Sequence, residues 1–305
     1  MLYSHRAEQA RTYKLTARSP KPLTKNLTIM QKSILITGAS TGIGYYTARA
    51  LKKAGYRVIA SCRSTVDVMR LQQEGLEAVQ LDLANSESIK RGFAQAMALT
   101  SNELYALFNN GAYGQPGAVE DLPISALRQQ FEPNFFGWCE LTNLALPIML
   151  QQGYGRIIQN SSVLGLTAMP LRGAYNASKY AIEGISDTLR LELEGTGVHV
   201  SLIEPGPIHS QFRKNALAAL HEHIDIEKSR HRASYTAAIA RLAKTESTTR
   251  FTLGPEAVYR RVIHALESKR PQARYYVTLP TYLLGFMKRI LPVRLLDKLL
   301  RKSGG

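Results

Sequence analysis

The chain has few cysteines and no long apolar runs, and each shortage excludes a class of protein. Among its 305 residues only Cys62 and Cys139 are available for thiol chemistry, and their spacing matches no metal-binding or Cys-x-x-Cys pattern. A secreted framework held by disulfides is therefore excluded, and a reducing, cytoplasmic setting fits best. No uninterrupted apolar run reaches the length of a transmembrane helix, so we expect a soluble chain.

Acidic residues are also scarce, because 23 Asp and Glu residues face 39 Lys and Arg residues, for a formal net charge of +16. Such an excess can indicate a nucleic-acid partner, since clustered basic side chains neutralise phosphates. Here much of the excess lies near the two ends of the chain, so we expect no nucleic-acid binding. These terminal basic residues are Arg6, Arg11, Lys14, Arg18, Lys21, Lys25, Lys288, Arg289, Arg294, Lys298, Arg301 and Lys302.

Residues 1–29 lack the apolar stretch of a signal peptide, and they are polar, basic and poor in acidic residues. Strand-like sequence begins almost directly after Met30. We therefore expect a disordered N-terminal extension. An organellar transit peptide is one explanation of this composition. The simpler explanation is that an upstream start codon was chosen in place of Met30.

Strand-like segments alternate with longer helical segments from Met30 onward, which predicts parallel strands joined by crossover helices. Several strand segments are apolar on both faces, as expected when helices cover both sides of a sheet. We expect one main α/β domain over residues 30–280, with a Rossmann-type doubly wound parallel sheet of about seven strands and helices on both faces. The predicted strands are Ser33–Thr37, Arg57–Ser61, Ala78–Leu81, Tyr105–Phe108, Arg156–Gln159, Val198–Ile203 and Tyr275–Thr278.

A glycine-rich turn follows the first strand and opens the next helix. Its spacing, G-x-x-x-G-x-G, lets backbone N–H groups approach a pyrophosphate at the positive end of the helix. The spacing differs from the common G-x-G-x-x-G pattern, and a tight turn that packs the helix onto the strand is the alternative. The position between strand and helix favours the phosphate interpretation. The predicted cofactor contacts in this turn are Gly38, Ser40, Thr41, Gly42, Ile43 and Gly44.

The end of the second strand predicts which nicotinamide cofactor is bound. An acidic residue here would bind the adenosine ribose diol of NAD, whereas a basic residue would bind the 2′-phosphate of NADP. The strand ends Ala60-Ser61-Cys62-Arg63, without a carboxylate. The guanidinium of Arg63 suits a phosphate, although a solvated surface arginine is the alternative. We therefore expect NADP(H).

Tyr175 and Lys179 carry the most specific chemical signal in the chain. They are four residues apart in a predicted helix and so share a face. A nearby ammonium favours the phenolate, which would lower the pKa of Tyr175 toward the working pH. Tyr175 could then donate a proton to a carbonyl oxygen whose carbon receives hydride, or remove one from an alcohol. Ser162, at a strand end, is placed to hold the same oxygen.

Together these segments resemble the short-chain dehydrogenase/reductase family, which shares the order of TGASTGIG, the Asn109-Asn110 turn, Asn134, Ser162, YNASK and PGPIHS. The resemblance covers roughly Met30 to Pro280. It implies a catalytic set formed by Asn134, Ser162, Tyr175 and Lys179, with the lysine also binding the nicotinamide ribose. It further implies cofactor contacts at Asp82, Leu83, Asn110, Gly111, Pro205, Gly206, Ile208 and Ser210.

Within the family, the chain looks most like the hydroxysteroid and retinol dehydrogenase-like branch and like bacterial NADP-dependent aldehyde reductases. The resemblance implies an apolar aldehyde, ketone or alcohol as substrate, no metal, and a homodimer or homotetramer. Two other functions stay open: an NADPH-sensing regulator without turnover, and a reductase of 3-ketoacyl chains on an acidic carrier protein. Intact Tyr175 and Lys179 count against the regulator.

Two positions depart from the family pattern. Gly111 and Ala112 reverse the usual Ala-Gly order, so the loop near the cofactor is expected to shift slightly. Pro133 directly precedes Asn134 in a predicted helix and should kink it, because proline removes a backbone donor. The role of Asn134 in the family is to support a water molecule in a proton relay, and it is less secure here for that reason.

Residues 211–250 are helical and rich in charge, and they follow the sixth strand, where they would overhang the substrate. Phe212, Leu217 and Leu220 are the predicted lid residues, and a surface excursion without function is the alternative. His221 and His223 in this segment do not predict a metal site, because residues two apart on a helix point in different directions.

The C-terminal tail, residues 281–305, has apolar residues at helical spacing on both sides of Pro292. Two short amphipathic helices are predicted. Their apolar faces could close the substrate pocket, pack against a second subunit, or lie weakly on an anionic membrane. Packing on the protein is the leading hypothesis, because helices with one apolar stripe usually bury it on their own fold. The apolar positions are Leu283, Phe286, Met287, Ile290, Leu295, Leu296, Leu299 and Leu300.

Overall fold

The computed structural model describes residues 31–244 and 250–303. The predicted disordered extension, residues 1–29, lies outside the described residues, as do residues 245–249 of the predicted lid.

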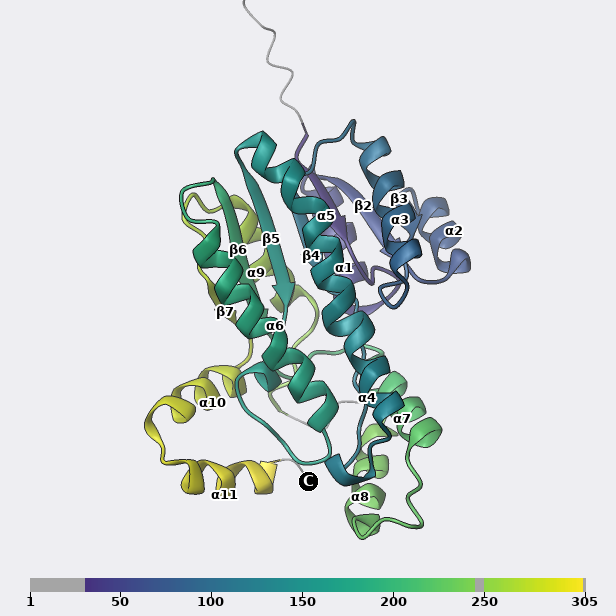
Figure 1. Cartoon of the computed structure of the whole chain (residues 1–305), viewed down its shortest axis with the longest axis vertical. Coiled ribbons are helices and arrows are strands. Elements are labelled where there is room, and N and C mark those ends of the chain that lie inside the picture. Colours follow the sequence, from purple (N-terminus) through teal and green to yellow (C-terminus); the bar gives the residue numbers. More distant parts are fainter. Residues whose placement is uncertain (1–30, 245–249, 304–305) are drawn as a thin grey trace, which may run out of the picture. The chain divides into compact units, whose positions relative to one another are not determined.

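Seven parallel strands form the sheet, in the order β3-β2-β1-β4-β5-β6-β7 (Figure 1). The order reverses between β1 and β4, and in such sheets ligands bind beyond the carboxyl ends of the strands at this point. The predicted fold class is confirmed. The strands are β1 (Ser33–Ile36), β2 (Arg57–Cys62), β3 (Glu77–Gln80), β4 (Ala106–Asn109), β5 (Gly155–Asn160), β6 (Val198–Glu204) and β7 (Arg274–Tyr276).

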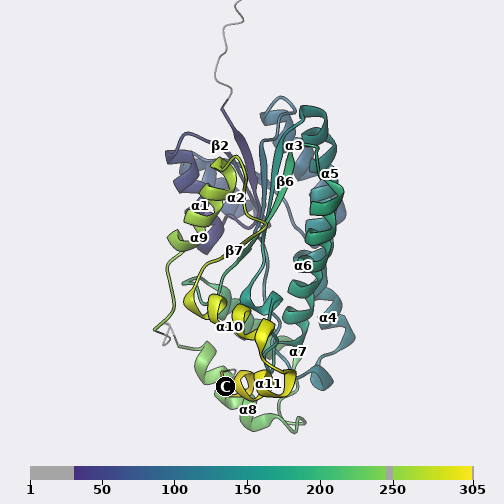
Figure 2. The same ribbon diagram turned by 90° about the vertical axis from the view of Figure 1, so that its left-hand side faces the viewer.

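Helices cover both faces of the sheet (Figure 2). On one face α1, α2 and α9 pack against the strands, and on the other face α3, α5 and α6 do so. The bounds are α1 (Gly42–Lys53), α2 (Thr65–Gln73), α3 (Ser86–Leu99), α5 (Gly137–Gln152), α6 (Gly173–Glu192) and α9 (Glu256–Glu267).

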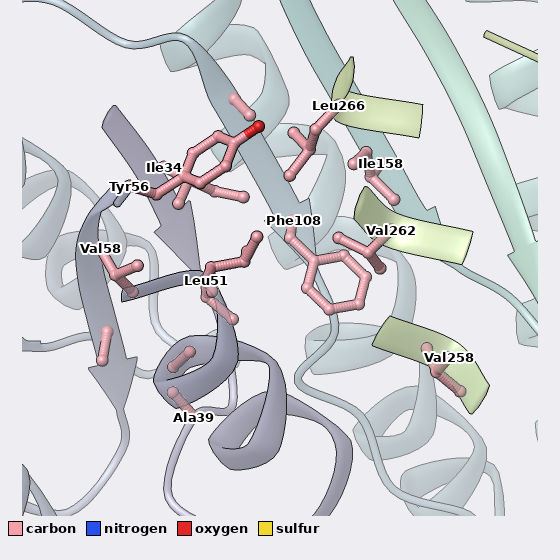
Figure 3. Packing of buried hydrophobic residues seen from close by; sticks show 14 of the residues in the cluster. Ile34, Ala39, Leu51, Tyr56, Val58, Phe108, Ile158, Val258, Val262 and Leu266 are labelled. Carbon is pink, nitrogen blue, oxygen red and sulfur yellow. The ribbon is translucent and has the colours of Figure 1, made fainter. Parts of the chain in front are cut away.

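Successive residues of a strand serve opposite faces, so each central strand contributes to two cores. Ile34 and Phe108 point toward the helices of the first face, where Phe108 lies close to Val262 of α9 (Figure 3). Their neighbours Leu35 and Leu107 are fully buried in the core of the second face. This burial on both sides explains why the strand segments are apolar throughout.

The segment around Pro133 differs from the expected kinked α-helix. A π-helical turn, η2 (Glu132–Phe136), joins α4 (Ile124–Phe131) to α5, and the Gly137 N–H donates to the carbonyl of Glu132. A π-helical turn is wider than an α-helical turn, and it accommodates Pro133, which has no backbone N–H to donate. The side chain of Asn134, within this turn, is fully buried.

The predicted lid forms a separate helical layer beyond the carboxyl ends of the strands (Figure 1). It contains α7 (Phe212–His223) and α8 (Arg232–Leu242), and a short 3-10 turn, η1 (Val119–Asp121), lies next to it. Leu220, Ile224 and Tyr235 form a small core with Ala118. The Tyr235 hydroxyl accepts from the Ala118 N–H at 2.8 Å and donates to Asp121 at 2.7 Å.

The C-terminal tail forms two helices, α10 (Leu279–Ile290) and α11 (Val293–Ser303), on either side of Pro292. The predicted strand Tyr275–Thr278 is shorter than expected, because β7 ends at Tyr276 and the chain then turns into α10 with Pro280 in its first turn. The tail helix therefore begins slightly before the predicted boundary at residue 281. In the described part of the chain, no helix is both long enough and apolar enough to cross a bilayer.

Candidate active site

The glycine-rich turn lies at the carboxyl end of β1, against the turn that follows β4. Gly38 has a φ of +62°, and a Cβ there would lie 2.5 Å from the Cα of Gly111. A Cβ at Gly111 would in turn lie 2.8 Å from the Leu83 side chain. Gly111 in place of the family's alanine therefore fits the close approach of these two backbones.

The start of α1 suits an anion. Thr41 precedes the helix without a hydrogen bond from its side chain to the first turn, and that turn has no acidic residue. The N-terminal N–H groups of the helix are thus available to a phosphate ligand. The loop after β6 borders the same place, since a Cβ at Gly42 would lie 3.1 Å from the Cβ of Ser210. These residues fit the pyrophosphate of a dinucleotide.

A chain of hydrogen bonds links the glycine-rich turn to the predicted catalytic lysine. The Thr37 hydroxyl accepts from the N–H groups of Asn110 and Gly111 at 2.8 and 3.0 Å. The Asn160 amide donates to the Asn110 side-chain oxygen at 2.9 Å, and the Asn160 carbonyl accepts from Lys179 Nζ at 2.8 Å. The strand ends of β1, β4 and β5 are thereby fixed to α6.

Lys179 is almost completely buried beneath this network. Its Nζ lies 4.3 Å from the ring centroid of Trp138, and the Trp138 indole N–H donates to the Gly111 carbonyl at 2.8 Å. Burial lowers the pKa of Lys179 to about 7, whereas the carboxylate of Glu183 raises it. The protonation of Lys179 is therefore poised near neutral pH.

Tyr175 lies on the same face of α6, with its ring centroid 5.7 Å from Lys179 Nζ. Burial raises the pKa of Tyr175 to about 12, whereas a hydrogen bond with Ser162 and the charge of Arg172 lower it. The lowered pKa expected from the sequence is thus not found, because desolvation of the phenol outweighs the nearby positive charge. Tyr175 is therefore protonated at neutral pH.

Ser162 follows β5 and begins the 3-10 turn η3 (Val163–Gly165), where its Oγ accepts from the Leu164 N–H at 3.1 Å. The Val163 N–H donates to the Pro205 carbonyl at 2.8 Å, which ties this turn to the end of β6. Gly206 follows, and a Cβ there would collide with the Thr278 hydroxyl. The ends of β5 and β6 are therefore packed tightly around the predicted oxygen site.

The Asn134 side chain is occupied by the loop that follows β4. Its oxygen accepts from the Tyr113 N–H at 3.1 Å, and its amide nitrogen donates to the Tyr113 carbonyl at 2.9 Å and the Ser178 hydroxyl at 3.2 Å. The side chain thus holds this loop against α6. Support for a relay water at Asn134 stays a prediction.

The remaining predicted cofactor residues follow β2, β3 and β6. Arg63 is exposed at the end of β2, and Asp82 Oδ1 accepts from the Ala84 N–H at 3.0 Å within its own loop. The backbone around Ile208 pairs with Leu253, and Ile208 packs against the core on the α1 side of the sheet. All of these positions lie at the carboxyl ends of the strands, where the sequence predicted the cofactor.

The lid residues divide into two kinds. The rings of Phe212 and Tyr175 meet edge to face with centroids 5.2 Å apart, and a Cβ at Gly114 would lie 2.5 Å from the Phe212 ring. Phe212 therefore borders the predicted catalytic tyrosine. Leu220, in contrast, is fully buried in the core between α7 and α8, and Leu217 is half-buried.

Basic side chains gather on the lid side of Tyr175. Arg172 directly precedes α6, whereas Arg213 and Arg241 belong to α7 and α8. Burial lowers the pKa of Arg172 to about 10, and the positive charges of Arg241 and Arg213 contribute to the shift. The Arg172 guanidinium contacts the Met169 sulfur at 3.1 Å. Because these positive charges act on one another, this region favours the binding of an anion.

An acidic cluster lies behind Lys179. Glu183, one turn further along α6, hydrogen-bonds to the Ser161 hydroxyl and to Arg274. Arg274 also donates to Glu204 at 2.7 Å and to Asp187 at 2.5 Å. Burial and the charge of Glu183 raise the pKa of Glu204, whereas the hydrogen bond and the charge of Arg274 lower it.

Several residues of this site were missed by the sequence argument. Thr37 and Asn160 act through hydrogen bonds, Trp138 through its indole N–H and its ring face, and Glu183 and Gly114 through partners distant in sequence. The strand-end positions of Thr37 and Asn160 were the available signal. His221 and His223 form no metal cluster, and no group of three or more His, Cys, Asp or Glu side chains within the described residues could hold a metal ion.

Comparisons with known proteins show which family the chain is similar to. The family model for short chain dehydrogenases matches residues 32–220. YbbO of Escherichia coli, described as an uncharacterised oxidoreductase, is 44% identical over 273 residues, covering 90% of this chain and 95% of that protein. Human retinol dehydrogenase 8 is 34% identical over 197 residues, covering 61% of this chain and 62% of that protein.

Among solved structures, a short-chain dehydrogenase from Streptomyces avermitilis superposes with a TM-score of 0.73 at 26% identity, covering 88% of this chain and 93% of that one. The chain therefore belongs to the short-chain dehydrogenase/reductase family. Members of this family are oxidoreductases that transfer hydride with NAD or NADP, and the resemblance inferred from the motifs is confirmed.

Proposed function

We propose that this protein is an NADP(H)-dependent oxidoreductase acting on the carbonyl or alcohol group of an apolar aldehyde, ketone or alcohol. The observation that carries the proposal is the placement of Tyr175, Ser162 and Lys179 beside a dinucleotide turn, joined to it by the Thr37–Asn110–Asn160 hydrogen bonds. The predicted nucleotide site and the predicted acid–base group therefore lie together at the carboxyl ends of the strands.

The proposed reaction follows from the chemistry of these side chains. A nicotinamide held by the glycine-rich turn and Lys179 would supply hydride for the carbonyl carbon, or accept hydride from the alcohol carbon. The Ser162 hydroxyl holds the substrate oxygen, and protonated Tyr175 donates to that oxygen during reduction. Lys179, protonated, stabilises the phenolate that Tyr175 leaves behind and binds the nicotinamide ribose. In oxidation Tyr175 takes the proton back.

We propose NADP(H) over NAD(H) because Arg63 lies exposed at the end of β2, where the turn has no carboxylate. A free guanidinium can bind the 2′-phosphate by charge-assisted hydrogen bonds. A reducing, cytoplasmic setting is also part of the proposal. Cys62 and Cys139, which are both free thiols, support it.

The proposed substrate class rests on apolar side chains near Tyr175. Phe212 borders its ring, and Val163, Leu164 and Met169 pack in the same cluster as Tyr175. Such a lining favours a substrate whose carbonyl or alcohol carries an apolar chain or ring. The similarity to retinol dehydrogenase 8 agrees with a retinoid, steroid or aliphatic aldehyde type of substrate.

Reduction of a 3-ketoacyl chain on a carrier protein is the second candidate. Arg172 and Arg241 favour it, because they would bind a phosphate or carboxylate attached to the substrate.

We also propose that the protein forms a homodimer or homotetramer, which sedimentation velocity tests.

The experiment is NADPH oxidation measured with a panel of aliphatic aldehydes, retinoids, steroid ketones and carrier-bound 3-ketoacids. We expect turnover with one of the apolar carbonyl compounds. Preference for the carrier-bound substrate would establish the second candidate. Tight NADPH binding without turnover on any substrate would instead indicate the NADPH-sensing regulator.

A further inference from the structure

The structure assigns the outward side of α10 and α11 to the surface of an anionic lipid bilayer. We propose that this surface, called the tail face, docks the protein peripherally. The tail face comprises Leu279, Leu283, Phe286, Ile290 and Val293 with the basic residues Arg289, Arg294, Lys298 and Arg301. The inference goes beyond the proposed reaction, and it does not depend on it.

The first observation is that α10 is apolar on two sides. Its inner side packs Leu284 and Met287 onto Val163 and Leu164, next to Tyr175. This satisfies the usual need of an amphipathic helix to bury one stripe on its own fold. The outer side should then be polar, and it is not.

The outer stripe of α10 consists of exposed apolar residues. Leu279, Leu283, Phe286 and Ile290 are spaced by four, three and four residues, so they share one face of α10, and each is more than half exposed. Val293, at the start of α11, is 73% exposed. Scattered single apolar residues are normal on a protein surface, but a continuous exposed stripe marks an interaction site.

The charge around the stripe identifies the partner. From residue 279 to 301 the sequence has five basic residues and a single acidic one, Asp297. Lys288 is engaged by Tyr180, whose hydroxyl accepts from its Nζ at 3.1 Å. The other four basic side chains belong to the tail face, and in the described parts of the chain no carboxylate pairs with them. Apolar residues flanked by basic ones fit an anionic membrane surface.

A second copy of the chain fits this face less well. A two-fold contact places the same patch on both subunits, so it would gather the four basic side chains of each tail face in one interface. Like charges facing each other disfavour such a contact. A bilayer with anionic headgroups offers opposite charge for the basic side chains and an apolar interior for the stripe.

Docking would bring the predicted catalytic residue Tyr175 close to the lipid. The inner side of α10 contacts the η3 turn and Met169, which share a cluster with Tyr175. Figures 1 and 2 both place α10 and α11 at the end of the sheet where the predicted site lies. An apolar substrate dissolved in the bilayer would therefore enter beside the helix that touches the membrane.

Co-sedimentation of the full chain with vesicles tests the proposal. We expect binding to vesicles of phosphatidylglycerol and phosphatidylcholine, little binding to phosphatidylcholine alone, and release by high salt, since screening weakens surface electrostatics. The Leu283→Ser/Phe286→Ser double variant should bind the anionic vesicles at least roughly tenfold more weakly than the parent chain. Each of Arg289→Gln and Lys298→Gln should weaken binding about fivefold.

Two control variants replace an exposed apolar residue and an exposed basic residue outside the tail face. Val66→Ser removes a side chain on α2 that is 68% exposed, and Arg91→Gln removes an exposed charge on α3. Both should bind vesicles like the parent chain, and all variants should keep the parent's thermal midpoint because the residues are at the surface.

Three results would overturn the proposal. One is absence of binding to the anionic vesicles. Another is binding that the tail-face variants leave unchanged, which would place the contact elsewhere in the chain. The third is a drop in sedimenting mass on Leu283→Ser/Phe286→Ser without vesicle binding by the parent, which would make the tail face an interface between copies.

Discussion

The cofactor side and the substrate side of this site are built from different kinds of contact. On the cofactor side, the turns after β1, β4 and β5 are held by hydrogen bonds of the Thr37, Asn110 and Asn160 side chains and by the close approach of two backbones at Gly38 and Gly111. On the substrate side, Phe212 and the tail helices meet Tyr175 and the η3 turn through apolar side chains. Backbone contacts demand particular residue types, whereas apolar packing tolerates many.

Tyr175 stands between the two sides, so its substitution should separate binding from chemistry most strongly. Tyr175→Phe keeps the ring contact with Phe212 but removes the proton donor. Turnover should fall roughly 10²- to 10⁴-fold, while NADPH affinity stays within a few-fold. Steady-state kinetics and a fluorescence titration of NADPH measure the two quantities, and a retained catalytic rate would refute the proposed acid–base role.

Gly38→Ala should damage the cofactor side alone. It forces a side chain onto a residue with φ of +62° and a Cβ to within 2.5 Å of Gly111. NADPH affinity should fall roughly tenfold or more, because strain of this kind costs about 1–3 kcal/mol.

Gly55→Ala is the matched control for this change. Gly55 also has positive φ, +91°, but a Cβ there meets nothing within 4 Å. It should lose some thermal stability and no cofactor affinity. Equal losses of NADPH affinity in both variants would show that the contact between Gly38 and Gly111 does not shape the cofactor site.

Arg63→Ala should lower the affinity for NADPH roughly ten- to a hundredfold and leave that for NADH unchanged, since a charge-assisted phosphate contact contributes about 1.5–3 kcal/mol. Titration with both cofactors measures this. Equal efficiency of the parent enzyme with NADPH and NADH would contradict the proposed role of Arg63.

The two kinds of lid residue should respond differently. Phe212→Ala should raise KM for an apolar substrate about three- to tenfold without changing NADPH affinity, because it removes an aromatic wall beside Tyr175. Leu220→Ala should mainly lower the free energy of unfolding, by about 2–5 kcal/mol, because Leu220 is fully buried. Denaturant unfolding and kinetics distinguish them, and an unchanged KM for Phe212→Ala would remove Phe212 from the substrate side.

The smallest expected effect concerns pH. Lys179 is protonated below its pKa of about 7, and Glu183 raises that pKa. Glu183→Gln removes the raising charge, so activity that needs protonated Lys179 should decline at a lower pH than in the parent. Asp187→Asn is the control, since Asp187 also binds Arg274. A profile of kcat/KM against pH that is identical in Glu183→Gln and the parent would exclude coupling of Glu183 to Lys179.

The sequence predicted the parts in which residue type is dictated by backbone geometry or by chemistry. The seven parallel strands follow from apolar runs that are buried on both faces, and the glycine turn follows from positions such as Gly38 that need positive φ. The predicted positions of Tyr175 and Lys179 on one helical face are likewise found on α6.

Long-range packing explains what the sequence could not predict. Nothing local to Trp138 indicates that its ring lies beneath Lys179, and Glu183 reaches Arg274 across 91 positions of sequence. The tail helices lie where helical spacing predicted them, but the packed side was partly wrong. Met287, Leu296 and Leu300 pack in one cluster with Val163 and Leu164 of the η3 turn. Leu283, Phe286 and Ile290 are exposed instead. Spacing defines a helix face without saying which face meets the protein.

The most direct test of the central claim is to follow the hydride itself. The enzyme is incubated with NADPH deuterated at C4 of the nicotinamide and with an apolar aldehyde that supports turnover, and the alcohol product is analysed by mass spectrometry. The account predicts deuterium on the former carbonyl carbon, with product formation abolished or nearly so in Tyr175→Phe. Unlabelled alcohol, or labelled alcohol formed equally fast by Tyr175→Phe, would contradict it.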